Sequence, residues 1–286
     1  MPELGESRFE RLLRRFAIER FLYRLGRSAD RDRFVLKGAI LLFAFGGRAA
    51  RPTRDLDLLG FGALGDDDLR ATLGGICAVE LEAPDGVEFL PAQLALTPIR
   101  VENEYGGTRL FLPYSIDTAR DRIQIDVGIG DQVYPEPEEI RYPTMLDLPP
   151  PRIRAYRRET VIAEKVEALV TLGATNSRLK DFYDLWALAT DEGYPGRELS
   201  KALRTTFDRR RTAWPDQDPE GLSPTFFEDG PRQEAWASFV QDRLLVTTAP
   251  PFPVIGQLLR TFLLPLLRAA GTEVAALNWS PTDGWK

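Results

Sequence analysis

Two short stretches in the first sixty residues decide the fold. Residues 34–39 read Phe-Val-Leu-Lys-Gly-Ala, which is an apolar strand that turns at a glycine. Residues 54–59 read Arg-Asp-Leu-Asp-Leu-Leu, and the alternation of polar and apolar side chains is typical of a half-buried strand. Side chains two positions apart on a strand point to the same face, so Asp55 and Asp57 share one face while the leucines turn into a core.

Asp55 and Asp57 are candidate metal ligands. Two neighbouring carboxylates repel each other, and a divalent cation removes this repulsion, because Mg²⁺ prefers hard carboxylate oxygens and leaves its other positions to water or phosphate. The alternative is that both residues are ordinary solvated side chains of a strand or turn, as most isolated Asp-x-Asp pairs are.

Two further features favour the metal site. The strand over 33–36 runs into Lys37-Gly38-Ala39, and a helix over 40–45 follows. Glycine lets the backbone approach a phosphate, and the unpaired N–H groups at the start of the helix can bind that phosphate. Residues 125–127, Ile-Asp-Val, place Asp126 on another strand. Its alternative role is that of a strand-end residue near the turn at Gly128. Taken together, the three pieces are far more specific than any one of them.

Composition excludes whole classes of chemistry. The 286 residues include no histidine, so Ser-His-Asp catalysis and histidine-bearing zinc sites are excluded. Cys77 is the single cysteine, which excludes disulfides within the chain and zinc ribbons, and fits a cytoplasmic location. The apolar stretch over 39–45 is too short to span a membrane, so we expect no membrane partner. The net charge is −6.

The chain is predicted to change character near its middle. Prolines crowd residues 135–151, which therefore cannot form a helix and mark a boundary between domains 1–148 and 149–286. Before this segment we expect helices over 7–25, ending at Gly26, and 40–45, and strands over 33–36, 53–59, 87–90, 93–101, 108–113 and 121–128. After it, the chain is predicted to be helical to its end, over 160–172, 177–190, 197–208, 233–245 and 253–270.

At this level of detail the sequence resembles a known family. Residues 34–39 together with 51–58, Arg-Pro-Thr-Arg-Asp-Leu-Asp-Leu, resemble the nucleotidyltransferase fold of the DNA polymerase β superfamily. More narrowly, they are similar to the AbiEii/MenT group of toxin nucleotidyltransferases. Residues 159–165, Glu-Thr-Val-Ile-Ala-Glu-Lys, and 177–185, Ser-Arg-Leu-Lys-Asp-Phe-Tyr-Asp-Leu, look like the two later motifs of that group. The resemblance covers about residues 30–190.

The resemblance implies an α+β fold and an enzymatic activity. We expect a mixed sheet flanked by helices, followed by a helical C-terminal domain. The implied function is transfer of a nucleotidyl group from a nucleoside triphosphate, with Mg²⁺ or alternatively Mn²⁺, to an RNA acceptor. In the best-understood branch the acceptor is the 3′ end of tRNA. The protein would then be the toxin of a toxin–antitoxin or abortive-infection system, restrained by a cognate antitoxin.

The resemblance also assigns roles in the first half of the chain. Asp55, Asp57 and Asp126 would hold the metal ions and carry catalysis, with Asp126 helping to deprotonate the attacking hydroxyl. Gly38 and Ala39 would contact the phosphates, with Lys37 nearby. Here the sequence departs from the superfamily pattern, which usually has Gly-Gly or Gly-Ser followed by a small or hydroxyl residue. This chain reads Gly38-Ala39-Ile40, so a hydroxyl contact to the phosphate is missing.

In the second half, the resemblance adds four residues to the nucleotide site. Lys165 and Asp184 would be catalytic, and Lys165 would also bind the triphosphate together with Lys180 and Asp181. From spacing alone, the favoured alternative is that Lys165 is an exposed side chain four positions after Val161 or a partner of Glu164. Asp181 and Asp184 lie three apart on one helix face, where they could pair with Lys165, orient it, or contact the base or ribose.

For an RNA acceptor, the candidate phosphate contacts are Arg152, Arg154, Arg157 and Arg158, interleaved with Tyr156, and the arginine run over 209–211. A solvated arginine-rich surface is the alternative. Two other functions stay open: a nucleotide-binding regulatory protein that has lost transfer, and a helical interaction module whose sheet is only a scaffold.

Overall fold

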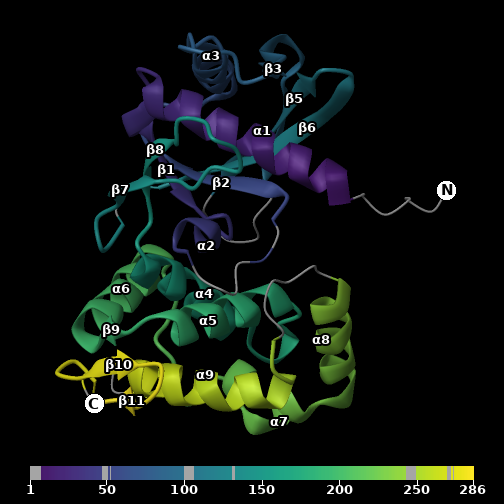
Figure 1. Ribbon diagram of the computed structural model, residues 1–286. Helices are drawn as coiled ribbons and strands as arrows, with labels where there is room; N and C mark the ends of the chain where they lie inside the picture. The colour runs from purple at the N-terminus through teal and green to yellow at the C-terminus, as the bar shows by residue number, and fades with distance from the viewer. Residues whose placement is uncertain are drawn as a thin grey trace. The chain divides into compact units, whose positions relative to one another are not determined.

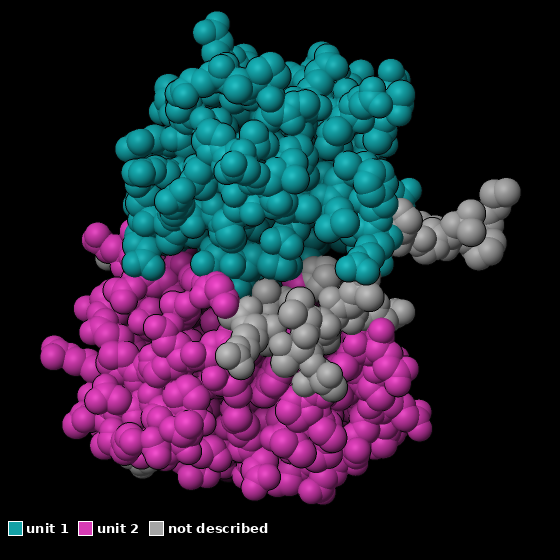
Figure 2. All heavy atoms as spheres, in the orientation of Figure 1, with its two compact units in different colours: residues 1–44, 53–131, 138–155 teal, residues 45–52, 132–137, 156–286 magenta. Residues whose placement is uncertain are grey.

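The computed structural model describes residues 8–46, 51, 53–99, 106–130, 133–242, 249–268, 272 and 274–286. Internal contacts divide the chain into two compact units (Figure 2). Unit 1 comprises residues 1–44, 53–131 and 138–155, and unit 2 comprises residues 45–52, 132–137 and 156–286. The domain division at 148/149 stays a prediction, because contacts define compact units and not parts that fold on their own.

Unit 1 is built on a mixed sheet of eight strands (Figure 1). The strand order is β3-β5-β6-β2-β1-β8-β7, with β4 also paired to β5. The β2–β6 and β1–β8 pairs are parallel and the others are antiparallel. The strands are β1 (Phe34–Lys37), β2 (Asp55–Gly60), β3 (Val87–Phe89), β4 (Ala95–Ile99), β5 (Gly107–Ile116), β6 (Ala119–Ile129), β7 (Glu138–Arg141) and β8 (Arg152–Ala155).

In the described residues of unit 1, three α-helices accompany this sheet: α1 (Arg8–Arg27), α2 (Leu41–Ala44) and α3 (Asp66–Cys77). Helix α1 packs on β6, β8 and α3, and its Phe21, Leu22 and Leu25 are fully buried. The prediction that α1 ends at Gly26 is wrong, since the helix continues to Arg27. A Cβ on Gly26 would lie 2.2 Å from the carbonyl oxygen of Arg152, so this glycine allows the helix to approach β8 closely.

Unit 2 contains six helices in its described residues: α4 (Arg158–Leu172), α5 (Leu179–Asp191), α6 (Gly196–Arg209), α7 (Pro224–Glu228), α8 (Gly230–Asp242) and α9 (Phe252–Leu267). Its core is aromatic, with the rings of Phe182, Phe226, Phe227 and Phe252 in mutual contact. Residues 243–245 and 269–270 of the expected helices lie outside the described part of the chain.

The prediction that the second half is helical to its end is wrong. A three-stranded sheet joins β9 (Tyr194–Pro195) to β10 (Asn278–Ser280) and β11 (Gly284–Trp285). Trp279 and Trp285 pack on the ring of Phe262 in α9, so aromatic burial holds these short strands in place. No helix in the described ranges has both the length and the apolar character that a membrane crossing needs.

Candidate functional site

Five side chains from five adjacent strands of unit 1 form a single row. Lys37 on β1 pairs with Asp57 on β2, which pairs with Asp126 on β6. Asp126 pairs in turn with Arg109 on β5, and Arg109 with Thr97 on β4. Directly paired residues project to the same face of a sheet, so this carboxylate row reads cation, carboxylate, carboxylate, cation, hydroxyl. Asp55, two positions before Asp57, lies on the same face.

The carboxylate of Asp126 is held by Arg109. Arg109 donates from Nε to Oδ1 at 2.8 Å and from Nη2 to Oδ2 at 2.7 Å, which is the bidentate geometry of a strong ion pair. Gln124 adds weaker contacts from Nε2 at 3.2 and 3.3 Å. The pKa of Arg109 is raised, first by the hydrogen bond to Asp126, with smaller contributions from Asp55 and Asp57. Arg109 therefore interacts electrostatically with all three predicted carboxylates.

Sequence reasoning missed Arg109, although a signal for it exists. Residues 117 and 118 form the two-residue turn of the β5–β6 hairpin, with Asp117 at a φ of 51°. A two-residue turn fixes the register of its hairpin, which places Arg109 opposite Asp126. The turn at residues 117 and 118 was not predicted from the sequence, so the register that pairs Arg109 with Asp126 could not be predicted either.

Position 38 requires glycine for two reasons, its backbone conformation and the close approach of Asp57. Its φ is +76°, and a Cβ at this position would lie 2.0 Å from Oδ2 and 2.8 Å from Cβ of Asp57. The side chain of Asp57 thus occupies the space that glycine leaves. Among the described residues, the N–H groups of Ala39 and Ile40 find no hydrogen-bond acceptor. The expected helix over 40–45 is shorter than predicted, because α2 spans only Leu41–Ala44.

The carboxylates of unit 1 fit a hard divalent cation in their chemistry and in their common face. They are not a closed cage, because among the described residues no three acidic, cysteine or histidine side chains converge on one point. Mg²⁺ is typically bound by one or two carboxylates together with substrate phosphates. Asp55 and Asp57, two carboxylates on one face, fit that mode, and Asp126 is held by the Arg109 ion pair.

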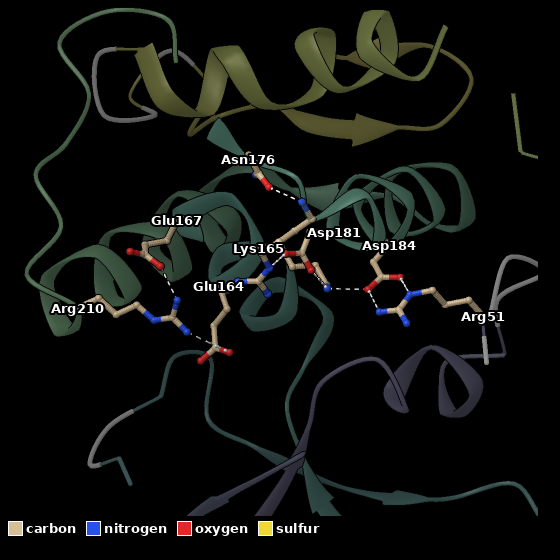
Figure 3. A network of polar contacts seen from close by, with 9 residues as sticks. Arg51, Glu164, Lys165, Glu167, Asn176, Asp181, Asp184 and Arg210 are labelled. Atoms are coloured by element: carbon tan, nitrogen blue, oxygen red, sulfur yellow. Dashed lines mark hydrogen bonds and ion pairs between the residues drawn. The ribbon is translucent and has the colours of Figure 1, made fainter. Parts of the chain in front are cut away.

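A second charged cluster lies inside unit 2 (Figure 3). Lys165 on α4 donates from Nζ to Asp181 at 3.0 Å and to Asp184 at 2.6 Å, both on α5. Arg51 donates from Nε and Nη2 to the two oxygens of Asp184 at 2.6 and 2.8 Å. Asp184 is fully buried. We call Arg51, Lys165, Asp181 and Asp184 the Asp184 cluster.

The electrostatics of the Asp184 cluster are those of a buried ion network. Burial would raise the pKa of Asp184, but the charges of Lys165 and Arg51 outweigh it and hold this pKa below its ordinary value. Burial would lower the pKa of Lys165, but Asp184 and Asp181 outweigh it and raise this pKa. Lys165 and Asp184 are thus charged together. Arg51 was missed because no periodic pattern marks it.

The start of α5 completes the environment of Asp181. Arg178 lies 2.7 Å from its carboxylate, and Asn176 accepts a hydrogen bond from the backbone N–H of Arg178 at 2.8 Å. The buried Nδ2 of Asn176 has no hydrogen-bond partner among the described residues. Lys180, predicted to bind the nucleotide, is exposed.

The arginines predicted to bind RNA are divided between the units. Arg152 and Arg154 belong to unit 1, and Arg157 and Arg158 to unit 2. Arg158 lies 2.6 Å from Glu192. The prediction that Tyr156 lies among these arginines at an RNA-binding surface is wrong, because its side chain is fully buried.

The arginine run over 209–211 has a structural role in its first two members. Arg209 lies 2.7 Å from Glu164, and Arg210 pairs with Glu167. These contacts join the end of α6 to α4, so they explain the first two arginines of the run without RNA.

The fold is shared with solved structures, two of which are named as nucleotidyltransferases. MenT4, a nucleotidyltransferase toxin of Mycobacterium tuberculosis, has a TM-score of 0.55 at 16% identity, over 94% of this chain and 87% of that one. JHP933 of Helicobacter pylori has a TM-score of 0.51 at 14% identity, over 95% and 94% of the two chains. A putative nucleotidyltransferase of H. pylori gives 0.50 at 14%, over 94% and 96%. At such identities the likeness establishes the nucleotidyltransferase fold.

The family follows from the sequence itself. The model of the AbiEii family, described as nucleotidyl transferase toxins of type IV toxin–antitoxin systems, matches residues 20–257. The chain belongs to this family, and the predicted family and α+β fold class are confirmed. No protein in a search of curated sequences matches it.

Proposed function

We propose that this toxin transfers a nucleotidyl group from a nucleoside triphosphate to an RNA acceptor in a Mg²⁺-dependent reaction, and that the acceptor is the 3′ end of tRNA. The carboxylate row beside Gly38 is the single observation that carries the proposal. It combines paired carboxylates, a glycine with positive φ and two N–H groups without an acceptor in the described chain. A cytoplasmic location and restraint by an antitoxin accompany it.

Each residue of the row has a task in this proposal. Asp55 and Asp57 hold the cation, which when bound neutralises charge on the phosphates. The N–H groups of Ala39 and Ile40 bind phosphate oxygens, and the missing hydroxyl at Ala39 is replaced by its backbone donor. Asp126 accepts the proton of the attacking hydroxyl. Lys37 starts at the β1 end of the row, reaches with its Nζ towards Gly128 on β6, and supplies positive charge for the triphosphate.

The Asp184 cluster serves nucleotide binding in this proposal. The ammonium of Lys165 keeps its charge because Asp181 and Asp184 raise its pKa, so it can bind phosphate as a point charge. Asp184 and Arg51 fix the position of that ammonium. Lys180 and Asp181 stay candidate nucleotide contacts, and Arg152, Arg154, Arg157 and Arg158 stay candidate RNA contacts.

A second candidate function is nucleotide binding without transfer. The observation that favours it is the ion pair of Asp126 with Arg109, which occupies a carboxylate that transfer would use, together with alanine at position 39. On this alternative the protein would bind triphosphate and release no pyrophosphate.

A labelling experiment distinguishes the two candidate functions. The protein is incubated with Mg²⁺, total tRNA and each nucleoside triphosphate in turn, labelled at the α-phosphorus in one series and the γ-phosphorus in another. Transfer puts α-label, and no γ-label, on RNA. Replacing Mg²⁺ by Mn²⁺ tests the choice of metal. Binding of triphosphate with no label on RNA and no pyrophosphate would support the alternative.

A further inference from the structure

The two ends of the carboxylate row are chemically different. At the β1 end, Lys37 adjoins the tight turn at Gly38. At the other end, Arg109 and Thr97 lie on β5 and β4, beyond Asp126. Neighbouring strands are about 4.8 Å apart, so Arg109 is one strand spacing from Asp126, and the backbone of Lys37 is two spacings away on the opposite side. The Lys37 side chain reaches back across the row, because its Nζ lies 3.9 Å from the place of a Cβ on Gly128 of β6.

Arg109 also faces a cavity. It lines a space of about 400 Å³ together with Thr97, Pro98 and Ile99. The Nε and Nη2 atoms of Arg109 are engaged with Asp126, while Nη1 donates to no described residue and the side chain is 40% exposed. One edge of the guanidinium thus holds a carboxylate and the other edge is open to an anion.

The lining of this cavity suits a nucleotide. Arg109 and the hydroxyl of Thr97 can bind phosphate oxygens, and the apolar faces of Pro98 and Ile99 can contact a ribose or base. A cavity of this size lies in the range of small-molecule sites.

The order of residues in the row indicates whether the triphosphate or the acceptor nucleotide binds at the Arg109 end. In an in-line displacement the entering oxygen approaches from the side opposite the leaving pyrophosphate. On the proposed function the triphosphate lies at the Gly38 end, so the acceptor enters from the Arg109 end. The acceptor's 3′-hydroxyl oxygen bonds to the α-phosphorus, the bond from that phosphorus to the bridging oxygen breaks, pyrophosphate leaves, and the hydroxyl proton passes to Asp126.

We propose that Arg109, with Thr97, Pro98 and Ile99, forms the acceptor subsite, in which Arg109 binds the phosphodiester next to the 3′-terminal ribose of the RNA while it positions Asp126. This inference rests on the proposed function for its direction, and its test includes binding measurements that do not depend on transfer.

The test compares Arg109→Gln, Arg109→Lys and Thr97→Val with a matched control. Asp121 and Asp126 both lie on β6, where Asp121 pairs with Arg14 and Asp126 pairs with Arg109. Arg14→Gln therefore removes a similar ion pair away from the row. The readouts are KM for RNA and for the triphosphate, and the affinity for a 5′-labelled RNA hairpin with a single-stranded 3′ end, measured by fluorescence anisotropy without triphosphate.

The proposal predicts a selective defect. Arg109→Gln raises KM for RNA and weakens hairpin binding by about tenfold or more, because a charge-assisted contact is lost. KM for the triphosphate changes less than about twofold. The slope of log Kd against log salt falls by about 0.7, as expected for one lost contact to a single strand. Arg109→Lys and Thr97→Val give intermediate defects, and Arg14→Gln none.

Three outcomes would overturn the proposal. One is an equal rise in KM for the triphosphate, which would place Arg109 in the nucleotide site. Another is unchanged RNA affinity and salt slope in Arg109→Gln and Thr97→Val. The third is an equal defect in Arg14→Gln. If wild-type protein binds the hairpin and transfers nothing, the proposed function fails, while weaker binding by Arg109→Gln still supports the subsite. Absence of hairpin binding by wild-type protein overturns the subsite as well.

Discussion

The contact between Gly38 and Asp57 allows a quantitative prediction for Gly38→Ala. The methyl group meets Asp57 at 2.0 Å from Oδ2 and at 2.8 Å from Cβ. Rotation of the Asp57 side chain relieves the first overlap but not the second, so the backbone of β1 or β2 must shift. Overpacking of this kind costs about 1–3 kcal/mol, and the positive φ adds about 1–2 kcal/mol for a residue other than glycine. The expected loss of stability is about 2–5 kcal/mol, with loss of nucleotidyl transfer.

Gly86→Ala is the control for this experiment. Gly86 lies in the same unit with a φ of +77°, and a Cβ there meets no atom within 4 Å. It therefore carries only the backbone cost of about 1–2 kcal/mol. Urea unfolding followed by circular dichroism gives both values, and label transfer gives activity. If Gly38→Ala is no less stable than Gly86→Ala, or keeps full activity, the reasoning about the Asp57 contact is refuted.

Three further predictions concern buried charges and the thiol. Asp184→Asn removes the buried carboxylate that pairs with Arg51 and leaves Lys165 with Asp181 alone, and it costs about 3–5 kcal/mol in urea unfolding at pH 7. The pKa of Asp184 is lowered in the folded state, so the stability from its charge is present above the unfolded pKa and is lost as the pH falls through the folded pKa. The loss of stability caused by the variant must therefore shrink in acid. A loss that does not depend on pH would contradict this. Burial raises the pKa of the Cys77 thiol to about 12, so at pH 8 iodoacetamide should label it far more slowly in the folded than in the urea-unfolded protein, as mass spectrometry would show; equal rates would be contrary evidence. Arg210→Met removes the cationic partner of buried Glu167, which keeps its hydrogen bonds from Thr171 and Thr212, and should cost about 1.5–3 kcal/mol, whereas a change below about 0.5 kcal/mol would show that this pair does not hold the end of α6 to α4.

The structural relations that the sequence indicated correctly are those marked by local rules. Asp55 and Asp57 share a face because strand side chains alternate, and β2 forms where the alternation predicts it. Lys165 meets Asp181 and Asp184 because positions three apart on a helix share a face. Such features depend only on the period of the backbone and not on which elements later become neighbours.

The features that were missed depend on long-range pairing. Arg109 joins Asp126 through a hairpin register, and Arg51 reaches Asp184 across 133 positions of sequence. The sheet of β9, β10 and β11 is similarly non-local, since β9 precedes β10 by more than eighty residues. Its strands are too short to show a period, and the aromatic contacts of Trp279 are visible only in the folded chain.

The central claim is that the carboxylate row carries out nucleotidyl transfer, and paired aspartate variants test it most directly. Asp57→Asn and Asp126→Asn keep the shape of the side chain and remove its charge on the row. Asp121→Asn changes the same residue type on β6, five positions from Asp126 and hence on the other face of the strand. With α-labelled triphosphate and tRNA, we expect no label on RNA from the first two variants and wild-type labelling from the third, at similar melting temperatures. Full labelling by Asp57→Asn or Asp126→Asn would contradict the account.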